Sequence, residues 1–170
     1  MQSCILVVEP FPAICRSVSR RLQEEGYRVY ESCQPSYITT VLRRKPIDVA
    51  LLGLDGLKKQ GLSLFNLIKT VRPRVEIITI NSSDQLQLSI EGMKLGAFDD
   101  FITPFDVDAM VCRVREACTR SKAKAKRKKS ILKRYQEAMV AATFAEAGAP
   151  DLAAEYWLPS DPTADEGSEK

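Results

Sequence analysis

The sequence predicts a doubly wound α/β protein in which five parallel strands alternate with helices, followed by a helical extension toward the C-terminus. Two observations predict this fold class. Short apolar runs recur five times within residues 1–119; the run of residues 4–8 is continuous, as expected of a strand that is buried on both faces, and that of residues 27–31 alternates, as expected of an edge strand. Each run is followed by a stretch whose apolar side chains recur at helical spacing. This alternation implies right-handed crossovers between parallel strands.

The individual elements follow from these runs. The expected strands cover residues 4–8, 27–31, 47–54, 75–80 and 98–102. The first helix is marked by Ile14, Val18 and Leu22 and should stop at Gly26, because glycine readily adopts the left-handed conformation that ends helices. Further helices are expected around residues 36–44, 64–71, 86–93 and 107–118.

Composition places the chain among globular proteins, with 170 residues of which 45% are hydrophobic and 28% charged. No apolar run approaches the ~20 residues that span a bilayer, so we expect no membrane span. The run of residues 4–8 is too short for a secretory signal and has no basic segment before it. These features predict a cytoplasmic location.

Histidine and cysteine usage excludes several kinds of active site. The chain has no histidine, and histidine is the commonest general base and a frequent metal ligand. Its five cysteines are widely spaced and contain no Cys-x-x-Cys pair. We therefore expect buried, reduced cysteines, with no disulfide framework, zinc site or catalytic triad.

Several short motifs occur in an order and spacing that is typical of one known family. They are Ile5-Leu-Val-Val8 followed by Pro12, Gly26-Tyr27-x-Val29, Pro46-x-Asp48, Gly61-Leu62, Gly96-Ala97-x-Asp99 and Pro104-Phe105. Residues 4–119 thereby resemble the receiver domain of response regulators, the chemotaxis-regulator-like module of two-component signalling and phosphorelay systems of bacterial type. The resemblance implies a flavodoxin-like (βα)5 sheet with strand order 2-1-3-4-5, and a cis peptide bond before Pro104.

The family's phosphorylation site is degenerate in this chain. Receivers place an acidic, magnesium-binding pair after the first strand, an acceptor aspartate at the end of the third, a hydroxyl at the end of the fourth and a lysine before the proline that follows the fifth. The matching positions read Glu9-Pro10, Gly53, Asn81 and Thr103. Glycine offers no carboxylate nucleophile, and the ligands that magnesium prefers are reduced to one carboxylate. We expect a pseudo-receiver with no catalytic residue, no metal and no cofactor, and hence no enzyme.

A displaced acceptor is the alternative that the sequence leaves open. Asp55 lies two residues beyond Gly53, so its side chain would face the same way if the third strand continued. The sequence favours a different interpretation, in which Asp55-Gly56 is a turn with a solvated carboxylate.

Charge is strongly segregated after residue 119. Residues 120–134 contain nine basic and no acidic side chains, whereas residues 135–170 contain eight acidic side chains and one basic one. The basic segment could attract nucleic acid or anionic lipid, but it has no aromatic residue to stack on bases. A solvated helix or linker is the favoured interpretation, and specific DNA recognition is not expected.

The segment 131–158 predicts two short amphipathic helices before an acidic tail, 159–170, that we expect to be disordered. Such helices cannot bury their apolar faces alone. They must pack on the receiver-like part, pair with a second copy or bind a partner. The expected anchors of this interface are Tyr135, Met139, Tyr156 and Trp157.

These features predict a phosphorylation-independent signalling adaptor that acts by protein–protein interaction. By resemblance, its contact face includes Met93, Phe105 and Asp100, the last of which stands where receivers place a switch aromatic. The expected partner is another signalling protein, such as a kinase or an output protein, or a second copy of the chain. The alternatives are a phosphorelay regulator that uses Asp55 and a nucleic-acid or anionic-surface binder that uses residues 120–134.

Overall fold

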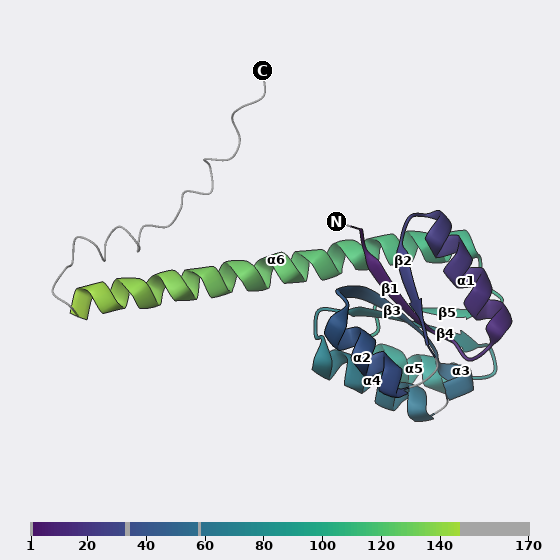
Figure 1. Ribbon diagram of the computed structural model, residues 1–170. Coiled ribbons are helices and arrows are strands. Elements are labelled where there is room, and N and C mark those ends of the chain that lie inside the picture. The colour runs from purple at the N-terminus through teal and green to yellow at the C-terminus, as the bar shows by residue number, and fades with distance from the viewer. Residues whose placement is uncertain (1, 33–34, 58, 147–170) are drawn as a thin grey trace, which may run out of the picture. The chain divides into compact units, whose positions relative to one another are not determined.

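The computed structural model describes residues 2–32, 35–57 and 59–146, and its helices and strands alternate as the sequence predicts (Figure 1). The elements are β1 (Cys4–Val8), α1 (Pro12–Glu24), β2 (Arg28–Glu31), α2 (Pro35–Arg44), β3 (Ile47–Gly53), α3 (Leu54–Leu57), α4 (Lys59–Val71), β4 (Glu76–Ser82), α5 (Leu86–Lys94), β5 (Asp99–Thr103) and α6 (Val107–Glu146). The chain divides into two compact units, Met1–Ala125 and Lys126–Lys170, and the sheet belongs to the first.

The sheet confirms the predicted topology. Its five strands are parallel and lie in the order β2-β1-β3-β4-β5. Val8 of β1 is level with Leu52 of β3, and Gly53 of β3 is level with Ile80 of β4. The residues that follow these three strands therefore emerge side by side at one edge of the sheet, where doubly wound proteins bind their ligands.

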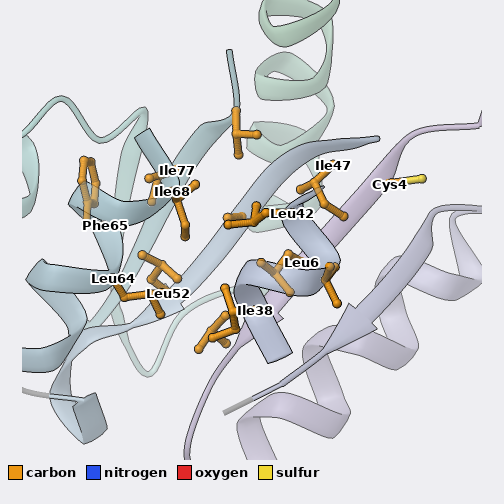
Figure 2. Close-up of a cluster of buried hydrophobic side chains, with 14 of the residues drawn as sticks. Cys4, Leu6, Ile38, Leu42, Ile47, Leu52, Leu64, Phe65, Ile68 and Ile77 are labelled. Carbon is orange, nitrogen blue, oxygen red and sulfur yellow. The ribbon is translucent and has the colours of Figure 1, made fainter. Parts of the chain in front are cut away.

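The core has two layers, one on each face of the sheet. Helices α2, α4 and α5 cover one face, and α1 and the first turns of α6 cover the other (Figure 1). Leu6 and its β1 neighbour Ile5 are both fully buried but belong to opposite layers, because alternate side chains of a strand point to opposite faces. The first layer, which includes Phe65 and Ile68 of α4, is drawn in Figure 2. Burial of each such side chain contributes roughly 1.5–3 kcal/mol.

Gly26 ends the first helix as the sequence predicts. Its φ of 82° lies in the left-handed region that glycine adopts without steric cost. The Gly26 amide donates a hydrogen bond to the carbonyl of Gln23, and the Tyr27 amide donates one to that of Leu22. These bonds satisfy carbonyl groups that the end of the helix would otherwise leave without donors.

The chain after β3 differs from the prediction. The strand ends at Gly53 and the single-turn helix α3 begins at Leu54, so Asp55-Gly56 is helical and the predicted turn is wrong. Leu54 is fully buried in the first core layer. A Cβ atom on Gly56 would lie 2.7 Å from Cγ of Pro10, which shows how closely α3 packs on the chain after β1. Tertiary packing thus overrides the local turn tendency of Asp-Gly.

The basic segment 120–134 lies within α6, which continues without a break from Val107 to Glu146. Two of its cations, Arg120 and Lys124, belong to the first unit and contact the buried carboxylate of Glu76 at the start of β4. Lys124 Nζ lies 2.6 Å and Arg120 Nε 3.3 Å from Glu76 Oε1, and this side chain is only 2% exposed. Arg120 and Lys124 are therefore not part of a purely solvated basic face.

The cysteines follow the prediction in part. Cys4 and Cys118 are buried, but Cys112 is exposed, and Cys33 lies outside the described residues. Burial raises the pKa of the Cys118 thiol to about 11, with a smaller opposing effect of a hydrogen bond from Ser3. Because the thiolate is the reactive form, Cys118 is unreactive at neutral pH.

Candidate functional site

A cleft of about 1100 Å³ opens at the carboxyl ends of the strands. It brings together four positions that the sequence singled out, and its walls mix carboxylate, amide and hydroxyl groups with apolar side chains. The lining residues are Glu9, Phe11, Ile14, Asp55, Gly56, Leu57, Gln60, Ile80, Asn81, Ser82, Asp84, Gln85, Leu88 and Thr103.

The carboxyl group of Glu9 occupies the space into which a side chain on residue 53 would extend. A Cβ atom on Gly53 would lie 2.0 Å from Oε2, 2.6 Å from Cδ and 2.8 Å from Oε1 of Glu9. The Glu9 side chain is held there, because its Oε1 accepts a 2.9 Å hydrogen bond from the backbone amide of Phe11 and the residue is 3% exposed. Glycine at position 53 is thus what allows Glu9 to turn inward.

This inward position raises the pKa of the Glu9 carboxyl group. Burial is the largest cause, the negative charge of Asp55 adds to it, and the hydrogen bond from Phe11 opposes both. The folded protein therefore binds a proton at Glu9 more tightly than the unfolded chain does. As pH rises above the ordinary glutamate value of 4.5, ionisation of Glu9 lowers the stability of the folded state.

We expect Glu9→Gln to raise the free energy of unfolding at pH 7, because the amide keeps the oxygen that accepts from Phe11 and carries no charge. Below pH 4.5 the two proteins should converge, since Glu9 is then protonated in both the folded and the unfolded state. Urea unfolding across this pH range and up to neutrality measures the difference, with Glu31→Gln at the exposed end of β2 as control. An equal gain at every pH would contradict this account.

Two buried oxygen atoms in the cleft have no hydrogen-bond donor among the described residues: Oδ1 of Asp55 and Oδ1 of Asn81. Asn81 is 1% exposed, and its amide nitrogen donates to Asp100. Asp55 lies in α3 and not on a continued β3, so the strand geometry that would have aligned it with residue 53 is absent. The cleft is therefore rich in acceptors and negative charge.

Asp100 on β5 is held by three side-chain donors. Its Oδ1 accepts from the Thr79 hydroxyl at 2.6 Å and from the Asn81 amide, and its Oδ2 accepts from the Ser89 hydroxyl. These donors come from β4 and α5, so one carboxylate links three neighbouring elements. Charge-assisted bonds of this kind are about twice as strong as neutral ones. Thr79 and Asn81 alternate with isoleucines in β4, and this alternation was the available signal for the network.

Thr103 lies where the lysine of the resembled family would stand. Its hydroxyl donates a 3.2 Å hydrogen bond to the carbonyl of Asn81, and the peptide bond to Pro104 is cis, as the resemblance implied. A threonine offers no positive charge to the cleft. A phosphoryl group there would lack the ammonium ion that balances its charge in receivers.

Comparison with known proteins adds to this geometry. The family model for the response regulator receiver domain matches residues 5–115. The chain belongs to this family. A response regulator of Rickettsia felis described as NtrX-like is 25% identical over 122 residues, covering 71% of this chain and 26% of the relative. The nitrogen assimilation regulatory protein NtrX of Azorhizobium caulinodans is 28% identical over 109 residues, covering 63% of this chain and 24% of its own length.

A solved receiver domain has the same fold. The CheY-like receiver domain protein of Methanospirillum hungatei superimposes with a TM-score of 0.66 at 19% identity, covering 73% of this chain and 99% of that one. The present chain spans about a quarter of the length of the NtrX-like relatives. No helix within the described residues is both long enough and apolar enough to cross a membrane.

The residues at the family's magnesium-binding positions do not fit the magnesium ion that the family implies. Pro10 and Gly53 supply no side-chain oxygen, and the carboxylate of Glu9 is turned onto Gly53 and bound to the Phe11 amide. Across residues 2–32, 35–57 and 59–146, no three acidic, cysteine or histidine side chains form a group that could hold a metal. Magnesium demands near-octahedral oxygen ligands, and the family's ligand positions in this chain keep only the carboxylate of Glu9.

The three residues of the expected contact face differ in their surroundings. Met93 on α5 is 47% exposed, Asp100 is bound to Ser89 of α5, and Phe105 is partly buried and packs on Phe101 against the core layer of α1 and α6. Sequence reasoning missed the residues that accompany Met93. Leu86 and Ile90, which are 58% and 40% exposed, continue its stripe along α5 at spacings of four and three residues.

The orientation of α5 explains why this apolar stripe faces outward. Its buried residues are Ser89 and Gly92, the first of which donates to Asp100. A Cβ atom on Gly92 would lie 3.3 Å from Cγ2 of Thr79, so the helix packs very closely on β4. The small, polar edge of α5 thus lies on the sheet, Leu88 packs partly buried against the first core layer, and Leu86, Ile90 and Met93 remain on the surface.

The residues expected at the tail interface are placed in part. Tyr135 and Met139 lie on α6 and are 64% and 53% exposed. Tyr156 and Trp157 lie outside the described residues, as does the expected acidic tail 159–170.

Proposed function

We propose that this receiver is a phosphorylation-independent signalling adaptor that acts through protein–protein contacts. The observation that carries the proposal is the position of Glu9, whose carboxyl group fills the space of the missing acceptor side chain on Gly53. A phosphoryl group attached here would need a nucleophile, a metal and a balancing cation. Gly53, Pro10 and Thr103 provide none of them.

The Asp100 network supports the same proposal. A phosphorylation-driven switch needs side chains on β4 and β5 with two alternative positions. Here Thr79, Asn81 and Ser89 all bind one carboxylate, and this link between β4, β5 and α5 favours a single arrangement of the three elements. We infer that the contact face of this receiver is permanently in one state.

The contact surface that we propose is the outward stripe of α5 with the neighbouring side chain of Ile102. Ile102 is 42% exposed and lies on the same side of β5 as Asp100, because the two are separated by one residue. Leu86, Ile90 and Met93 add three more exposed apolar side chains. A stripe of this kind on a folded domain is typical of a protein interaction site. The partner class remains that of the family, a kinase or an output protein.

The test combines a phosphodonor with surface variants. The full chain is immobilised with or without acetyl phosphate and Mg²⁺, and proteins retained from a cytosolic extract are quantified. We expect the same set of partners in both states, no phosphoryl group by intact-protein mass spectrometry, and loss of those partners in Met93→Asp. Tyr37→Asp, which changes a similarly exposed side chain on α2, should retain them. A phosphoryl adduct, or binding that depends on the donor, would refute the proposal.

One observation favours a second candidate function. Oδ1 of Asp55 is buried in the cleft without a described donor, so this carboxylate is the remaining candidate for a phosphoryl acceptor. If it reacts, the mass adduct formed with acetyl phosphate should disappear in Asp55→Asn and persist in Asp84→Asn. The same measurement therefore distinguishes the two functions.

A further inference from the structure

The second compact unit carries an exposed apolar stripe on α6. Ile131, Leu132, Tyr135 and Met139 are 58%, 54%, 64% and 53% exposed. At about 100° per residue, these four side chains fall within an arc of roughly 100° on one side of the helix. A stripe this wide matches the face that a helix buries against a partner helix.

Charged residues of opposite sign lie beyond the two ends of this stripe. Lys128 lies three residues before Ile131, and Glu146, the last residue of α6, lies seven residues after Met139. They are separated by 18 residues, which is about five helical turns, so both point in the direction of the stripe. Lys126 and Lys133 point to the other side, where Lys133 forms a 3.6 Å ion pair with Glu137.

We propose that residues 128–146 pair with the same segment of a second copy as two antiparallel helices. A two-fold interface requires a surface that is complementary to itself when it is turned end for end. A two-fold axis that crosses the helix pair at the level of residue 137 places Lys128 of each copy opposite Glu146 of the other, so this ion pair forms twice per dimer. The same operation brings Tyr135 opposite Met139.

The charge pattern favours an antiparallel second copy over a parallel second copy and over an anionic membrane. Parallel helices would place Lys128 against Lys128 and Glu146 against Glu146, which is unfavourable at both ends. An anionic membrane would attract the cations of residues 126–134, but Glu146 at the end of the stripe would face the lipid headgroups. The antiparallel pair satisfies both ends of the stripe at once.

Sedimentation equilibrium of the full chain over a wide concentration range tests the proposal by charge reversal. We expect a reversible dimer whose dissociation constant rises about tenfold in Lys128→Glu and in Glu146→Lys, because two attractive pairs become repulsive in each variant. The double variant K128E/E146K should return to within about threefold of the parent, because both pairs are restored with reversed sign. Lys126→Glu makes the same change of charge on the other side of the helix and should have little effect.

Other outcomes overturn the proposal. A chain that stays monomeric at every concentration contradicts it. A dimer that persists unchanged in Tyr135→Asp also contradicts it, because that dimer must form through another surface. The antiparallel register is excluded if Lys128→Glu and Lys126→Glu raise the dissociation constant equally. It is also excluded if the double variant dimerises no more tightly than the single variants. If the chain does not dimerise but sediments with phosphatidylglycerol vesicles, and Glu146→Lys strengthens its binding to them, the surface that the stripe binds is a membrane.

Discussion

Gly53→Asp should lower the free energy of unfolding by about 2–4 kcal/mol at pH 7 without creating a phosphorylation site. The new Cβ would lie 2.0 Å from Oε2 of Glu9, so the Glu9 carboxyl group must leave its place and lose its bond from Phe11. The substitution also adds a carboxylate to a cleft that already contains Glu9 and Asp55. Like charges brought together in a buried site raise one another's pKa and destabilise the ionised form.

Urea unfolding measures the loss, and intact-protein mass spectrometry after exposure to acetyl phosphate and Mg²⁺ measures phosphorylation. Combining Gly53→Asp with Glu9→Ala removes the overlap, so this pair should recover at least about 1 kcal/mol relative to the sum of the single losses. Strict additivity would show that Glu9 does not occupy the place of the missing side chain. A phosphoryl adduct on the carboxylate introduced by Gly53→Asp would show that the metal and lysine positions are dispensable.

Asp100→Ala should cost about 2–4 kcal/mol, because it removes the acceptor of three side-chain donors at once. Ser89 is buried, and its hydroxyl would have to find water or remain without an acceptor, whereas the Thr79 hydroxyl would keep only its longer 3.4 Å hydrogen bond to the carbonyl of Asp99. Because Ser89 lies on the edge of α5 that packs on the sheet, hydrogen exchange in α5 should accelerate as well. Urea unfolding and amide exchange give the two measurements.

Two controls separate the network from the general effect of removing a carboxylate. Asp100→Asn keeps an acceptor oxygen in the same place and should lose only about half as much stability. Asp84→Ala removes an exposed carboxylate that binds Ser82 and should change stability by less than about 1 kcal/mol. If Asp100→Ala were no worse than Asp84→Ala, the three bonds would not hold β4, β5 and α5 together.

Much of this receiver was predictable from local patterns. The five apolar runs and the helical spacing between them predict the doubly wound sheet, because strand and helix periodicity depend on residues only a few positions apart. Gly26 predicts the end of α1 for the same reason, since its conformational freedom is a property of one residue. That residue 53 carries no carboxylate is also visible directly, because glycine has no side chain in any fold.

The tertiary structure alone decided which side chains surround Gly53 and Asp100. The position of Glu9 over Gly53 and the binding of Asp100 by Thr79, Asn81 and Ser89 join residues from different elements. Such contacts depend on how strands and helices pack, so the local alternation of Thr79 and Asn81 indicates two polar side chains on one face of β4 but does not identify their partner. The stripe of Leu86, Ile90 and Met93 has helical spacing in the sequence, yet its exposure follows from the close packing of Ser89 and Gly92 on the sheet. Periodicity reveals which side chains share a face, and packing determines which face is buried.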